Sequence, residues 1–135
     1  MASGIYPRFK ANLMNKVVDL EADTIKVALL NNSHSFNTAH NVLADVSANE
    51  VSGAGYVAGG EALAGKAVTQ GATTKWDAND ISWLAATFSA YHAVIYDDTL
   101  AGKDLIASID FGGVQAVSDG TFEIQFDVAG IITLT

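Results

Sequence analysis

Apolar and polar residues alternate with a period of two in several short segments of this chain, and this alternation constrains the fold more than any other feature. The cleanest example is TFEIQFDV (121–128), where Phe122, Ile124, Phe126 and Val128 are expected to point inward and the polar residues between them outward. Successive side chains of a strand point to opposite faces of a sheet, so this pattern is typical of a strand with one buried face.

Other segments are also expected to be strands, most of them after residue 73, and the one at 86–98 is apolar on both faces, which is typical of a central strand. The expected strands are DTIKVALL (23–30), a short strand broken by Gly65, two strands flanking the turn DAND (77–80), ATFSAYHAVIYDD (86–98), DLIASIDFG (104–112), TFEIQFDV and GIITLT (130–135). Strands spaced by roughly 8–12 residues, with turn residues between them, favour an antiparallel sandwich or barrel. The sequence therefore predicts an all-β fold of seven or eight strands, and the missing strand–helix alternation argues against a parallel α/β sheet.

One helix is expected, in IYPRFKANLMNKVVDL (5–20). Phe9, Leu13 and Val17 recur at intervals of four and form an apolar stripe. Pro7 suits the first turn of a helix, where its missing N–H group costs nothing. Because 135 residues is the size of one domain, we expect a single domain over 1–135, with a helical segment at 1–20 and a β-sandwich at 23–135.

The charge balance excludes several kinds of partner. The chain carries 15 acidic and 7 basic residues, a formal net charge of −8. Nucleic acids and anionic membrane surfaces are bound mainly by Lys and Arg, so we expect neither as a partner.

The chain has no cysteine, which excludes thiolate chemistry. We find no run of signal-peptide length at the start and no apolar run long enough to span a membrane, and expect the protein to fold in a cytoplasm.

The segment GEALAGKA (60–67) nearly matches the phosphate-binding pattern G-x-x-x-x-G-K-[ST], with both glycines and Lys66 in place. Ala67, however, stands where a Ser or Thr would bind magnesium, and Glu61 would place a carboxylate among the phosphates. No buried strand precedes the segment and no helix follows it. We therefore interpret it as a glycine-rich loop that allows close packing, and not as a nucleotide site.

The remaining candidates for chemistry are scattered. His34 and His40 share one loop, with Asp45 beyond it, but their spacing of six residues places them on no common face. His92 lies within an expected strand, where a core or interface role is more common than catalysis. No G-x-S-x-G motif is present. We expect no catalytic residue, no metal and no cofactor, and hence no enzymatic activity.

Aspartates and tryptophans suggest two further kinds of site. A loop calcium site could be built from Asp80, Asp97, Asp98 and Asp104, but the spacing D-x-[DN]-x-[DN]-G is absent. Exposed tryptophans stack on sugars, so Trp76 and Trp83 could form a carbohydrate platform together with the loop at 31–44. The chain has only 12 aromatic residues with which to build a core, so burial of both tryptophans is the preferred interpretation.

Longer blocks of the sequence resemble a family of small structural proteins of tailed-bacteriophage virions. The resemblance covers nearly the whole chain: the blocks are GIYPRFKANLMNKVVDLEADTIKVALLNNSHSF, ADVSANEVSGAGYVAGG, AVIYDD, LIASIDFGG and TFEIQFDVAGIITL. It implies a structural part of the particle, with decoration (cementing) of the capsid as the first hypothesis and the virion as the location. It implies no catalytic residues.

The expected partners are the major capsid protein and neighbouring copies of the same chain. The basic N-terminal segment supplies the candidate contacts, Arg8, Phe9, Lys10 and Lys16, while the acidic remainder faces solvent. A trimer, a dimer and a monomer are all compatible with the sequence. Two alternatives stay open: a tail or neck component or glycan-binding adhesion module, and a small metal-dependent hydrolase built on His34, His40 and Asp45.

Overall fold

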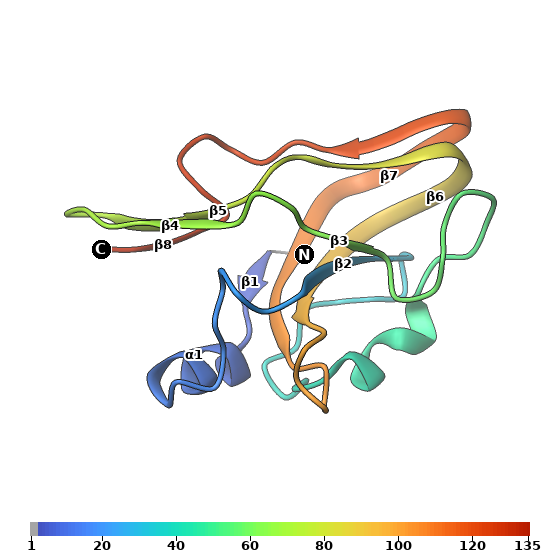
Figure 1. Ribbon diagram of the computed structural model, residues 1–135. Helices are drawn as coiled ribbons and strands as arrows, with labels where there is room; N and C mark the ends of the chain where they lie inside the picture. The colour runs from blue at the N-terminus through green and yellow to red at the C-terminus, as the bar shows by residue number, and fades with distance from the viewer. Residues whose placement is uncertain (1–2) are drawn as a thin grey trace.

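Antiparallel strands are the main regular structure of residues 3–135, the part of the chain that the computed structural model describes (Figure 1). The strands are β1 (Gly4–Ile5), β2 (Ile25–Leu30), β3 (Glu61–Ala62), β4 (Ala67–Thr69), β5 (Thr74–Asp77), β6 (Ile81–Asp97), β7 (Leu105–Ile124) and β8 (Ile132–Leu134). One α-helix, α1, spans Pro7–Met14, and two 3₁₀ turns span Leu43–Asp45 and Ser47–Asn49. The expected all-β class with an N-terminal helix is thus confirmed.

The strands form two sheets. The larger has the order β1-β7-β6-β2-β3, and the smaller has the order β4-β5-β8. The long hairpin of β6 and β7 dominates the larger sheet: it pairs from Tyr96 and Leu105 near its turn to Ile81 and Ile124 at its far end. Figure 1 shows this hairpin rising from its turn and folding back over the top of the molecule, where its ends lead toward the smaller sheet.

Irregular pairing allows the hairpin to bend. Register shifts lie on both sides of Ala86, and Ala85 and Asp119 have positive φ angles of 49° and 50°. Bulges of this kind bend a strand and increase its twist. The bend closes the hairpin over the main core, in which the Trp83 and Phe122 rings lie 5.9 Å apart and neighbour a large aliphatic cluster.

Strand β2 is buried on both faces because a second, smaller core lies on the other side of the larger sheet. Val27 and Leu29 point into the main core, whereas Ala28 and Leu30 point into the smaller one. The segment 31–50 covers this second core with Val46, and Phe36 and Leu43 pack against it. The near-continuous apolar run of β2 reflects this double burial.

The helix is shorter than the expected 5–20. It ends at Met14, and Lys16 adopts a left-handed φ of 61° that stops the helical path. Of the predicted apolar stripe only Phe9 is buried, since Leu13 and Val17 are 37% and 45% exposed. The spacing of four residues therefore predicted the helix correctly, but only its first turn has a buried apolar residue, and the stripe does not continue as a buried face.

In two places, two strands that the sequence predicted separately form one continuous strand. The segment after the DAND turn continues into 86–98 as β6, and 104–112 continues through 121–124 as β7. Gly112 and Gly113 form a bulge and not a turn: β7 takes five residue steps from Asp110 to Gln115, where β6 takes two from Ala90 to His92. The alternation after residue 121 ends at Ile124, and Val128, expected to point inward, is exposed.

Candidate functional site

Exposed apolar side chains lie on both helix α1 and the smaller sheet. The smaller sheet projects sideways from the body, with α1 below it (Figure 1). Val68, Trp76 and Ile132 pair across the three strands, so their side chains share one face of this sheet. The Trp76 indole N–H donates a hydrogen bond of 3.0 Å to the carbonyl of Leu20, which ties the sheet to the chain that follows α1.

A groove remains open between α1 and this face. It has a volume of about 110 Å³, and Phe9, Leu20, Trp76 and Ile132 lie along it. Its rim carries three partly or largely exposed apolar side chains, Leu13, Val68 and Leu134. We call this hollow, with those rim residues, the sheet groove. An apolar groove with exposed aliphatic residues around it is typical of a surface that another protein covers.

The four residues predicted to contact a partner have different environments. Phe9 is 3% exposed and packs in the main core, so this expectation is corrected: its side chain holds α1 in place and, although it lies along the sheet groove, presents almost no surface to a partner. The Arg8 guanidinium is half-buried, with Nε 3.9 Å from a carboxylate oxygen of Asp104. Lys10 and Lys16 are exposed. Lys16 lies beyond the helix, not on it.

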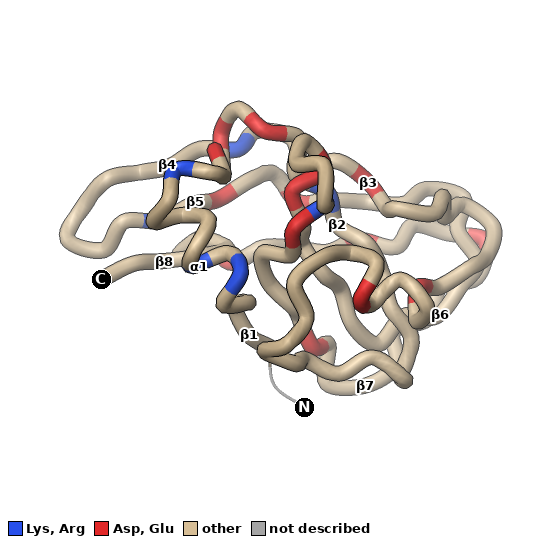
Figure 2. The backbone as a smooth tube through the Cα atoms, turned by 90° about the horizontal axis from the view of Figure 1, so that it is seen from below, with Lys and Arg blue, Asp and Glu red and all other residues tan. Residues whose placement is uncertain are grey.

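Basic residues concentrate at this end of the molecule. Five of the seven Lys and Arg residues lie in α1, just after it, just before β4 or in β5: Arg8, Lys10, Lys16, Lys66 and Lys75. Figure 2 shows most of their positions around α1, β4 and β5. The other two, Lys26 and Lys103, pair with Asp98 at 3.5 and 2.5 Å.

The sequence pattern indicated α1 as part of the contact surface but did not indicate Val68 and Leu134, because strands of three residues show too little alternation.

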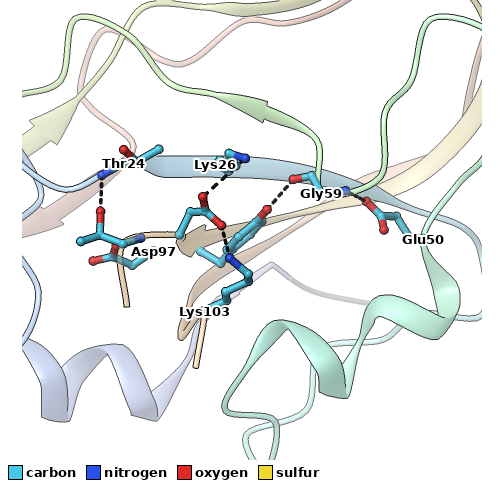
Figure 3. Close-up of polar contacts among 9 residues, drawn as sticks. Thr24, Lys26, Glu50, Gly59, Asp97 and Lys103 are labelled. Carbon is cyan, nitrogen blue, oxygen red and sulfur yellow. Dashed lines mark hydrogen bonds and ion pairs between the residues drawn. The ribbon is translucent and has the colours of Figure 1, made fainter. Parts of the chain in front are cut away.

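The glycine-rich stretch at 52–71, which includes GEALAGKA, binds a carboxylate of the protein itself. The Tyr56 hydroxyl donates a hydrogen bond to Glu50 and accepts one of 3.0 Å from the Leu29 N–H. Glu50 also accepts the Gly59 N–H at 2.7 Å, and the Tyr96 hydroxyl donates to the Gly59 carbonyl at 2.6 Å (Figure 3). Burial, reinforced by Glu50, raises the pKa of Tyr56 far above its usual range, so its hydroxyl stays neutral and donates. The segment packs against β2 as an anchored loop.

Two histidines lie in a buried polar cluster that sequence reasoning did not assemble. The His34 Nε2 atom lies 2.9 Å from the Ser108 hydroxyl, and the His34 ring makes an edge contact with His92 at a centroid distance of 5.1 Å. Burial, with smaller contributions from His92 and His40, lowers the pKa of His34 to about 4. Ser108 is 2% exposed. A serine–histidine pair is thus present, and the serine side chain is buried.

The aspartates considered for calcium binding are divided among separate roles. Asp80 accepts the Phe126 N–H at 2.8 Å, and Asp104 accepts the Asn12 side-chain amide at 2.7 Å. Asp98 pairs with the two lysines shown in Figure 3. Asp97 is buried beside the Asp23 carboxyl, and burial together with that carboxyl raises its pKa to about 7. Over residues 3–135, no three His, Asp or Glu side chains converge as ligands for a metal ion.

Trp76 and Trp83 are 2% and 1% exposed. The preferred interpretation, burial, is confirmed, and neither ring can serve as a carbohydrate platform. The adhesion hypothesis loses the residues on which it depended. In the loop at 31–44, His34 and Phe36 turn toward the protein.

Among the described residues, no helix is long and apolar enough to cross a membrane. Comparisons of the chain with protein-family models, with curated proteins and with solved structures gave no match.

Proposed function

We propose that this protein is a non-enzymatic structural subunit of a tailed-bacteriophage particle, a decoration protein that binds the outer surface of the capsid. The proposal joins the resemblance of the sequence blocks to virion proteins with one structural observation. That observation is the sheet groove, whose rim residues Leu13, Val68 and Leu134 are exposed on a part of the fold that projects from the body.

The sheet groove is suited to an extended or helical segment of the major capsid protein. Apolar side chains inserted between α1 and the smaller sheet would cover Leu134 and Val68 and bury their surface, which is the main source of affinity in protein association. Lys75 borders the groove and Lys66 immediately precedes β4. These charges favour a capsid segment with acidic residues and disfavour a basic one.

Co-sedimentation with phage heads that lack the protein tests the proposal. We expect saturable binding at a fixed ratio to the capsid subunit, and the ratio gives the symmetry of the binding site. Leu134→Asp should weaken binding at least about tenfold, because it places a charge on the rim of the groove. The control is Leu84→Asp, which changes a more exposed leucine on β6, outside the groove, and should bind as the unchanged protein does.

Two results would contradict the proposal. If the protein does not bind heads but binds isolated tails or necks, the function is that of a tail or neck component. If it binds heads and Leu134→Asp and Val68→Asp bind equally well, decoration stands but the sheet groove is not the contact surface.

A further inference from the structure

The outer edge of β7 is open over most of its length. Within residues 3–135 the strand that pairs along this edge is β1, opposite Ala107 and Ser108. Single hydrogen bonds also occupy Leu105, Ile106 and Asp110, so the open part of the edge begins after Asp110. Two adjoining hollows of about 410 and 440 Å³ lie along β7. The first lies beside β1 and residues of the segment 124–132, and the second is lined by residues between 109 and 125. Both hollows are lined by Ile109, Ile124 and Gln125, so they form one continuous groove, which we call the β7 groove.

The β7 groove has an apolar floor and acidic residues beside it. Phe111 and Phe122 line one hollow, and several isoleucines line the other. Glu123 lines one hollow and Asp127 the other, and both residues are exposed. No Lys or Arg lines either hollow. A surface that fits this groove therefore combines apolar side chains with positive charge.

The same chain presents such a surface at the end of α1. Met14 is 87% exposed and Val17 is 45% exposed, and the exposed Lys10 and Lys16 lie beside them in the sequence. Lys10 and Met14 are four residues apart on α1, so they share one face of the helix. We call these four residues the helix patch. None of them lines the β7 groove, so one molecule can use both surfaces at once.

We propose that the helix patch of one copy docks in the β7 groove of a second copy, so that the chain associates head to tail. Met14 and Val17 would enter the apolar hollows while Lys10 and Lys16 approach Glu123 and Asp127. Such a contact joins two different surfaces and continues from copy to copy, closing into a ring if the rotation between copies allows it. This inference does not depend on the proposed binding to the capsid, which would use the sheet groove.

A strand from another protein is the competing occupant, since open strand edges recruit strands. The β7 edge is poorly suited to this. The bulge at Gly112 and Gly113 and the positive φ of Asp119 interrupt it, so it offers no long straight run of backbone groups. The hollows between the side chains remain available at such an edge. A helix can fill them with its side chains, because it does not need a regular series of backbone hydrogen bonds to β7.

Sedimentation velocity of the purified full chain tests the proposal. We expect association that grows with protein concentration and weakens between about 20 mM and about 500 mM salt, because the contact joins opposite charges. Met14→Glu should weaken association at least about tenfold by placing an acid against the acidic groove. Ala116→Trp should do the same by filling a hollow that the exposed Ala116 lines. Val57→Glu, at another largely exposed apolar position, in the glycine-rich stretch at 52–71, is the control.

Mixing the two variants distinguishes a head-to-tail contact from a symmetric one. Met14→Glu retains an intact groove and Ala116→Trp retains an intact helix patch, so an equimolar mixture should form a dimer that grows no further. Circular dichroism checks folding, and Lys10→Glu is a second helix-patch variant if Met14→Glu is not folded. A protein that is monomeric in all conditions overturns the proposal. Association that is unchanged in Met14→Glu, Lys10→Glu and Ala116→Trp also overturns it. A mixture that stays monomeric overturns the head-to-tail arrangement.

Discussion

A Cβ atom on Gly60 would lie 1.8 Å from the carbonyl oxygen of Val27. The glycine-rich segment approaches β2 this closely because β3 pairs with it directly after Gly60. The feature that resembles a phosphate-binding loop is therefore a packing requirement: only glycine leaves room for the β2 backbone, and its φ of 80° is unfavourable for other residues.

Gly60→Ala should destabilise the fold by more than about 3 kcal/mol, because a backbone clash adds to the strain of a positive φ. Urea denaturation measures the free energy of unfolding. Gly112→Ala is a matched control: its φ is 79°, but a Cβ there has no atom within 4 Å, so only the backbone strain of about 1–2 kcal/mol is expected. Equal losses in the two variants would contradict this explanation.

Tyr56→Phe should lower the free energy of unfolding by about 1–3 kcal/mol, because it leaves the Leu29 N–H without its partner and removes a donor from Glu50. Tyr96→Phe removes one hydrogen bond, to the Gly59 carbonyl, and should cost less. Both losses are measured by urea denaturation at pH 7. A larger loss for Tyr96→Phe would show that Glu50 does not organise this loop.

Asp97 should make the protein less stable as the pH rises. Its pKa is about 7 in the folded protein against an ordinary value of 3.8, so between these values the folded state binds more protons than the unfolded state. The free energy of unfolding therefore falls as the pH rises through this window and levels off above about 7. Asp97→Asn should stabilise the protein at pH 8, on the order of 2 kcal/mol, and have little effect near pH 4.

Denaturation curves of Asp97→Asn and the unchanged protein at several pH values check this sign. Asp23→Asn, which removes the neighbouring carboxyl, should give a gain in the same direction. Asp98→Asn should give none, since Lys103 lowers the pKa of Asp98 and stabilises its charged form. Destabilisation by Asp97→Asn at pH 8 would contradict the inferred repulsion between the Asp23 and Asp97 carboxyls.

His34 should act in the opposite direction at lower pH. Its pKa is lowered from 6.5 to about 4, so the unfolded state binds more protons between these values. The stability associated with neutral His34 is complete above about pH 6.5 and is lost as the pH falls toward 4. His34→Gln keeps a hydrogen-bonding group near Ser108 and should flatten this part of the pH profile. NMR titration of the imidazole signal measures the pKa directly, and a value near 6.5 would refute the prediction.

The fold class was predictable because the alternation in β2, β5 and the two halves of β7 is a local property of the sequence. The hairpin was not: whether Gly112 and Gly113 make a turn or a bulge depends on which residues of β6 lie opposite them. The end of α1 was overestimated for a similar reason, since Leu13 and Val17 repeat at helical spacing without any surface to cover them.

The candidate sites show the same division between local and long-range information. The basic character of α1 could be read from Arg8, Lys10 and Lys16. The sheet groove could not, because it requires Val68 and Leu134, which are far apart in the sequence and meet only through pairing with β5. Ser108 and His34 were likewise separated, and no local motif indicates that a strand and a distant loop place them 2.9 Å apart.

Cryo-electron microscopy of phage heads saturated with the protein tests most directly whether it is a decoration subunit bound through its smaller sheet. The proposal predicts density for the domain on the outer surface of the head, with β4, β5, β8 and the sheet groove against the shell and the long β6–β7 hairpin facing solvent. Heads without added density, or domains bound with the smaller sheet pointing away from the shell, would contradict it.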